Sequence, residues 1–99
     1  MTRARTDTGD DRALLTAARA GDERAFACLL ERHRCDLETY CYLMLGCPHA
    51  AARVVRTTAL VAWRRRELAG GGCARIWLYR IATRACLDHL DGRDDFPPA

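Results

Sequence analysis

The sequence predicts an all-α fold, a compact bundle of four helices in which the last two form an antiparallel hairpin. Of the 99 residues, 17 are alanine and 12 are leucine, whereas valine and isoleucine together number five. This balance favours helix over strand. Apolar residues recur at helical spacing in four segments, which are separated by glycine and proline. A chain of this length supports a single domain.

The first helix is expected from Asp10 or Asp11, either of which can cap its N-terminus, to Ala20. Gly21 is typical of a residue that ends a helix. The preceding residues 1–9 are rich in threonine, arginine and aspartate and have nothing to bury. A disordered arm is therefore expected there.

The second helix is predicted to be the longest, from a cap at Asp22 to Leu45, before Gly46 and Pro48. Its apolar positions alternate four and three residues apart and so share one face: Phe26, Leu30, His33, Leu37, Tyr40 and Met44. On this face His33 is interpreted as a core histidine with a satisfied hydrogen bond rather than as a ligand.

The third helix is expected over residues 49–66 and the fourth over residues 74–90, with a glycine loop between them. The arginine run at residues 64–66 suits either phosphate binding or the negative end of the helix dipole. Trp63 is expected to be buried in packing. Trp77 borders the loop, so both packing and base stacking remain open for it.

Residues 92–99 contain acidic residues and prolines and are expected to form a tail or linker, which leaves residues 10–91 as the helical domain. The chain is either a fragment that ends in this linker or a natural protein reduced to one domain. No run approaches the ~20 apolar residues of a membrane span, and the polar, charged first residues contain no apolar segment of the kind found in a signal peptide. A cytoplasmic protein without a membrane partner is expected. The net charge of +3 permits a nucleic-acid partner without requiring one.

The residues that enzymes use for covalent and acid–base chemistry form no recognisable pattern. Serine is absent, paired carboxylates lack an obvious cleft, and no glycine-rich phosphate loop follows a strand. The sequence therefore favours a protein that is not an enzyme, unless chemistry has been acquired at its cysteines or histidines.

Four segments match a known pattern in order and spacing: AARAGDERAFACLLERH at 17–33, CYLMLG at 41–46, Ala62 with Trp63, and WLYRIATRACLDHL at 77–90. Together they resemble the second conserved region, the promoter-melting domain, of bacterial sigma factors of the extracytoplasmic-function class. The resemblance covers nearly all of residues 11–90. It implies the sigma region 2 fold and a transcription regulator that binds the RNA polymerase core, promoter DNA or both.

In that family the third helix holds the clamp helices of RNA polymerase. The loop before the fourth helix, together with that helix, captures flipped bases of the non-template strand. The resemblance implies a polymerase-binding face formed by Ala52, Arg53 and Arg56. It also implies an anti-sigma factor as a partner, and a DNA-binding face formed by Arg75, Trp77, Arg80, Arg84 and Asp88.

Several of these contact positions depart from the family pattern. Arg53 and Arg56 stand where the family has acidic and amide residues, so attraction to a basic clamp surface becomes repulsion. Arg84 replaces a usual asparagine, and it could pair with Asp88 along the helix instead of contacting DNA. A sigma-like regulator with altered or weakened contacts is the favoured function. The alternative is a repurposed sigma-like domain that acts in protein interaction or depends on thiols or a metal, without promoter recognition.

The six cysteines are expected to be free thiols or metal ligands in a reducing cytosol. Cys41 and Cys86 fall where similar proteins also carry cysteine, so they are expected to be small buried apolar residues. The other four cysteines have no such counterpart. Cys28 and Cys35 fall opposite the apolar face of their helix, ~10.5 Å apart along its axis, too far to pair with each other. Their thiols suit an intermolecular contact or redox modification, with accidental substitution as the alternative.

A metal site is a further hypothesis. An antiparallel hairpin would bring together the start of the third helix and the end of the fourth, and with them Cys47, His49, Cys86 and His89. Two thiols and two imidazoles suit tetrahedral zinc or another transition metal. The alternative is that the protein has no cofactor, since most of these residues fit the family pattern without a metal.

Overall fold

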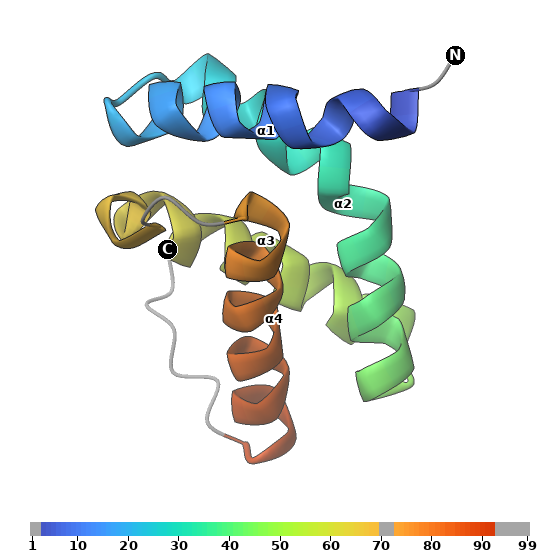
Figure 1. Cartoon of the computed structure of the whole chain (residues 1–99). Coiled ribbons are helices and arrows are strands. Elements are labelled where there is room, and N and C mark those ends of the chain that lie inside the picture. Colours follow the sequence, from blue (N-terminus) through green and yellow to red (C-terminus); the bar gives the residue numbers. More distant parts are fainter. Residues whose placement is uncertain (1–2, 70–72, 93–99) are drawn as a thin grey trace.

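The computed structural model describes residues 3–69 and 73–92, and within them the fold is all-α, with no strand (Figure 1). These described residues form four α-helices, and a short 3₁₀ helix, η1 at Arg66–Ala69, follows the third. The α-helices are α1 at Arg3–Arg19, α2 at Glu23–Leu45, α3 at Pro48–Arg64 and α4 at Ala74–Leu90. The predicted four-helix fold is confirmed. None of the described helices is long and apolar enough to cross a membrane.

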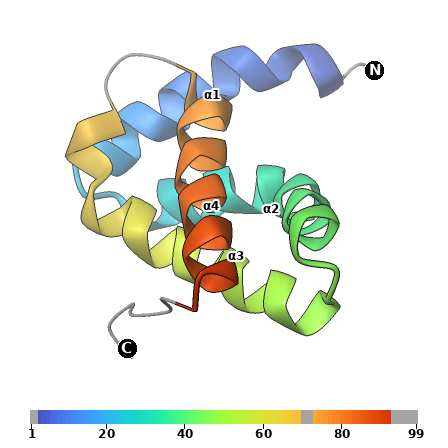
Figure 2. The same ribbon diagram turned by 90° about the horizontal axis from the view of Figure 1, so that it is seen from below.

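Helix α2 is the centre of the bundle, because it packs against α1, α3 and α4 (Figures 1 and 2). Helices α3 and α4 are consecutive and pack against each other, as predicted. In both views they cross instead of lying side by side along their length. The first turn of α3 therefore lies away from the last turn of α4.

The core is built from one face of each helix. The larger side chains come mainly from α2, whereas α3 and α4 contribute mostly small residues, which let the helices approach closely. The central buried residues are Ala18, Phe26, Leu37, Cys41, Ala51, Val54, Ala62, Leu78, Ala82, Ala85 and Cys86. The predicted face of α2 is confirmed, and Leu30, Tyr40 and Met44 are partly buried against this core.

The caps of α2 explain why its bounds agree with the prediction. A carboxylate oxygen of Asp22 accepts hydrogen bonds from the backbone amides of Arg24 and Ala25, at 3.0 and 3.1 Å. At the other end Gly46 adopts a left-handed conformation with φ of 73°, and its amide donates to the Tyr42 carbonyl. Both caps are local, so the sequence alone indicates where this helix begins and ends.

The predicted start of α1 is wrong. The helix begins at Arg3, so most of the arm expected at residues 1–9 is helical, and residues 1–2 lie outside the described residues. Asp11 does not cap the helix, because its buried carboxylate accepts from Arg32 Nε at 2.9 Å and lies 2.7 Å from His33 Nε2. This contact joins α1 to α2 and confirms His33 as a core histidine with a partner.

Most of the tail expected at the C-terminus, residues 93–99, lies outside the described residues.

Candidate nucleic-acid interface

A groove of about 680 Å³ runs between the end of α3, η1 and α4. Its walls combine arginines with apolar side chains and a single carboxylate. The lining residues are Val61, Arg64, Arg65, Leu68, Trp77, Arg80, Ile81, Arg84, Ala85 and Asp88. The members from α4 are three or four residues apart in sequence and so share one face of that helix.

The groove is strongly basic. Arg64 and Arg65 come from the end of α3, Arg80 and Arg84 come from α4, and all four are exposed. Asp88 is the only carboxylate among the lining residues, and its Oδ1 atom lies 3.6 Å from Arg84 Nε. The ion pair within the helix, which the sequence left open as an alternative to a DNA contact, is present. The remaining excess of positive charge attracts phosphate groups.

The two tryptophans have different roles. The ring centroids of Trp63 and Phe26 are 5.1 Å apart. The Arg66 guanidinium stacks on Trp63, with its central carbon 3.9 Å from the centroid of the Trp63 ring. The predicted packing role of Trp63 is confirmed. Trp77 is half-buried: it packs against the buried residues and also lines the basic groove. It therefore combines packing with an accessible apolar edge, the kind of surface on which a base can stack.

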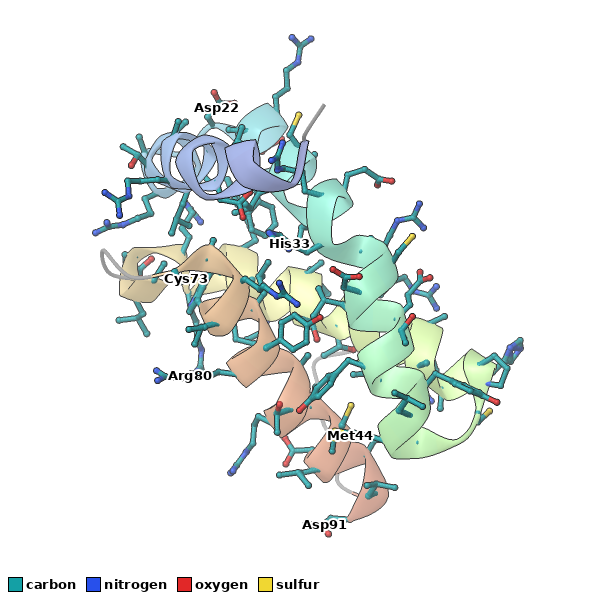
Figure 3. The ribbon with its side chains drawn as sticks, turned by 45° about the vertical axis from the view of Figure 1, so that its right-hand side comes forward. Asp22, His33, Met44, Cys73, Arg80 and Asp91 are labelled. Atoms are coloured by element: carbon teal, nitrogen blue, oxygen red, sulfur yellow. The ribbon has the colours of Figure 1, made fainter. Side chains whose placement is uncertain are left out.

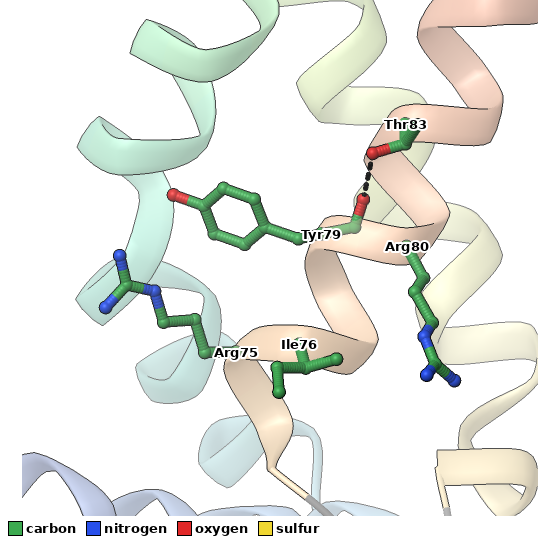
Figure 4. A pocket seen from close by; sticks show the side chains of 5 residues that line it. All are labelled: Arg75, Ile76, Tyr79, Arg80 and Thr83. Carbon is green, nitrogen blue, oxygen red and sulfur yellow. Dashed lines mark hydrogen bonds between the residues drawn. The ribbon is translucent and has the colours of Figure 1, made fainter.

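A second hollow of about 450 Å³ lies along α4 and is lined by Arg75, Ile76, Tyr79, Arg80 and Thr83 (Figure 4). Several contacts position the residues that line it. The ring centroids of Tyr79 and Tyr40 are 5.0 Å apart, and the central carbon of the Arg75 guanidinium lies 5.5 Å from the centroid of the Tyr79 ring. The Thr83 hydroxyl donates to the Tyr79 carbonyl at 2.8 Å. Arg80 lines both hollows and points away from the bundle (Figure 3). It joins them into one basic surface.

The structure brings together most of the residues predicted to bind DNA. Four of the five line the basic groove, and Arg75 lines the second hollow. Sequence reasoning left the role of the arginine run at residues 64–66 undecided. The run divides: Arg64 and Arg65 line the groove, whereas Arg66 donates to the Trp63 carbonyl at 2.7 Å. Periodicity could not reveal that the end of α3 faces α4.

The residues predicted to bind RNA polymerase lie on α3, where Arg53 and Arg56 are exposed and Ala52 is half-buried. Ala52 also lines a hollow of about 290 Å³ between α2 and the start of α3. Glu38 and Tyr42 of α2 line the same hollow, and Arg34 Nη1 lies 3.6 Å from Glu38 Oε2. Glu38 thus supplies a carboxylate next to this face, which sequence reasoning missed.

The predicted metal site is not formed. Cys86 is fully buried in the core, whereas Cys47 and His49 are exposed at the start of α3. The crossing of α3 and α4 separates these residues from the end of α4, where His89 lies. Among the residues that the structure describes, no three His, Cys, Asp or Glu side chains are grouped so that they could hold a metal ion.

Cys41 and Cys86 are buried next to each other in the core, as predicted for small apolar residues. Burial, together with the neighbouring Cys86, raises the pKa of the Cys41 thiol to about 12. Burial also raises the pKa of Cys86. Both thiols are therefore protonated and unreactive near neutral pH. The other four, Cys28, Cys35, Cys47 and Cys73, are exposed.

Comparison with known proteins agrees with this geometry. Residues 29–95 match the family Sigma-70 region 2. The chain belongs to the sigma-70 region 2 family. It is 44% identical over 75 residues to "ECF RNA polymerase sigma factor SigG" of Mycobacterium tuberculosis, in both strain CDC 1551 / Oshkosh and strain ATCC 25618 / H37Rv. No solved structure gives a significant match.

The predicted resemblance to ECF sigma factors is thus confirmed for the region 2 domain. Each match to SigG covers 73% of this chain but 20% of the relative. The chain therefore spans about a fifth of the length of the curated relatives it matches. In this region 2 domain, the part of α2 from Leu29 onwards and all of α3 and α4 lie within the family match.

Proposed function

We propose that this region 2 domain acts in transcription initiation by binding single-stranded promoter DNA along α4 and the RNA polymerase core along α3. The observation that carries the proposal is the convergence of four arginines and Trp77 in one groove. Proteins that bind single strands combine a positively charged groove with aromatic surfaces on which bases stack. The relatives named as RNA polymerase sigma factors support the same function.

Each part of the surface has a distinct task in this proposal. Arg64 and Arg65 hold phosphates on the α3 wall of the groove, and Arg84 holds them on the α4 wall. Trp77 offers its accessible edge to an unstacked base of the non-template strand. Arg80 lies between the two hollows, so a strand that passes from one to the other crosses it. Asp88 neutralises part of the charge of Arg84, which limits phosphate attraction at that end.

Binding to a single-stranded oligonucleotide tests the DNA part. Fluorescence anisotropy at low and physiological salt would compare the parent protein with Arg80→Ala and with Arg12→Ala, an exposed arginine on α1. Both variants lose one charge, so a difference between them reports position rather than net charge. We expect Arg80→Ala to weaken binding about tenfold, consistent with a charge-assisted contact of ~1.4 kcal/mol, and Arg12→Ala to weaken it less than twofold. Equal effects would contradict the proposed site.

Polymerase binding is tested separately. The face formed by Ala52, Arg53 and Arg56 carries arginine where the family has an acid, so we expect core polymerase to bind weakly through it. Arg53→Asp should strengthen this binding, and Arg12→Asp is the matched control for net charge. If the parent binds neither the polymerase core nor single-stranded DNA at micromolar concentration, the repurposed domain without promoter recognition becomes the better account.

A further inference from the structure

Two free cysteines lie together in the core, on helices that are far apart in the sequence. Cys41 belongs to α2 and Cys86 to α4, and both side chains are fully buried in the central cluster. Each thiol affects the pKa of the other, which requires the two side chains to be close. Beside them, the hydroxyl oxygens of Tyr40 and Thr83 are 2.5 Å apart, and this hydrogen bond joins α2 to α4.

We propose that Cys41 and Cys86 form an intramolecular disulfide when the protein is exposed to hydrogen peroxide. The bond links α2 to α4, so the pair is a reversible redox-modification site inside the bundle. This inference goes beyond the proposed function and does not depend on it, because neither cysteine lines the basic groove.

Close packing of α2 and α4 gives the two cysteines a separation that suits a disulfide. Ala82 and Ala85 are buried beside Cys86, so small side chains let the helices approach closely. Packed helices have axes about 8–10 Å apart, which brings facing Cα atoms to about 5 Å. Disulfides join Cα atoms about 4.4–6.8 Å apart. The pair can therefore close with little movement of the backbone.

Oxidation requires a transient opening of the bundle, because burial raises the pKa of both thiols and keeps them protonated in the closed fold. Each cysteine lies only one helical turn before the end of its helix, at Leu45 or Leu90. Both of these ends lie at the bottom of Figure 1. Helix ends open at a lower free-energy cost than the centre of a core. Such an opening hydrates the thiols and admits a small oxidant.

The reaction balances with hydrogen peroxide as the oxidant. The thiolate of one cysteine attacks a peroxide oxygen, which breaks the O–O bond and gives a sulfenic acid and hydroxide. The thiolate of the other cysteine then attacks the sulfur of the sulfenic acid, which forms the S–S bond and releases a second hydroxide. The two protons lost by the thiols convert both hydroxides to water. Two thiols are thus oxidised to one disulfide, and one peroxide is reduced to two waters.

The test uses the full chain without its exposed thiols, so that only the buried pair can react. The replacements are Cys28→Ser, Cys35→Ser, Cys47→Ser and Cys73→Ser. After peroxide treatment, intact mass should show a monomer that has lost two hydrogen atoms and takes up no alkylating agent in denaturant. Dithiothreitol should restore both thiols. The disulfide should raise the midpoint of thermal unfolding by about 10 °C. Adding Cys41→Ala or Cys86→Ala should abolish the monomeric disulfide.

Three results would overturn the proposal. In the first, both thiols still take up the alkylating agent after peroxide treatment. In the second, peroxide adds oxygen atoms to a single thiol and no disulfide forms. In the third, the disulfide forms but lowers the midpoint of thermal unfolding, which would show that the folded bundle does not accommodate it.

The rate of oxidation tests the opening step. Tyr40→Phe removes the hydroxyl that contacts Thr83 and should speed disulfide formation at least about threefold, because α2 then separates from α4 more often. Tyr42→Phe removes the hydroxyl of an exposed tyrosine on the same helix and should leave the rate unchanged. Equal rates in the two variants would contradict oxidation through separation of α2 from α4.

Discussion

Asp11 is a residue whose role depends on a distant part of the chain. Its carboxylate accepts from Arg32 and contacts His33, and both partners lie on α2. The sequence correctly indicated His33 as a core histidine, because it falls on the apolar face of a long helix. It could not reveal Asp11 as the partner, because an aspartate near an expected helix start is equally suited to capping.

Replacing Asp11 by alanine should destabilise the protein. The change leaves the buried His33 ring without its partner and removes an ion pair from Arg32. A buried polar group without a partner costs about 1–3 kcal/mol, so we expect a loss of about 2 kcal/mol in the free energy of unfolding. Urea denaturation provides the measurement, and Asp36→Ala, on the exposed face of α2, is the control. Equal stability of the two variants would contradict the proposed fastening of α1.

Cys41 should make stability depend on alkaline pH. Burial raises its pKa from the ordinary value of 9.0 to about 12. Between these values the unfolded chain releases a proton that the folded chain retains, so the free energy of unfolding falls as the pH rises above 9. Denaturation at several pH values should show a steeper fall for the parent than for Cys41→Ala. Cys35→Ala, at an exposed thiol, should follow the parent.

At the scale of elements, local signals decided which helix boundaries could be predicted. The bounds of α2 and α4 agree with the sequence, and Asp22 and Gly46 mark the ends of α2. The end of α3 does not agree: the helix ends at Arg64, and a 3₁₀ helix follows. Arg66 donates to the Trp63 carbonyl and stacks on its ring, so it satisfies a terminal backbone group and ends the α-helical pattern.

The cap of α2 gives a test at this scale. Asp22→Ala removes two hydrogen bonds to the first turn of the longest helix. We expect a loss of about 1 kcal/mol in the free energy of unfolding, whereas Asp22→Ser, which can still cap, should lose less than half as much. Thermal or urea unfolding would measure both. Equal losses for the two variants would show that the side-chain cap does not stabilise α2.

At the scale of the whole molecule, the crossing of α3 and α4 decides which of the predicted groups of residues lie together. The sequence placed Trp77, Arg80, Arg84 and Asp88 on one face of α4, and the structure places all four in one groove. The metal hypothesis needed the start of α3 next to the end of α4, and the crossing keeps them apart. The hydrophobic periodicity of α3 and α4 does not indicate the angle at which the two helices cross.

The central claim is that single-stranded DNA binds in the groove between α3 and α4. An NMR titration of the isotope-labelled protein with a short single-stranded oligonucleotide tests it most directly, because each backbone amide reports separately. The account predicts saturable shifts that weaken with salt, concentrated on the end of α3 and along α4, with residues 24–39 on the outer face of α2 unaffected. Shifts centred on the outer face of α2, or none at micromolar DNA, would contradict it.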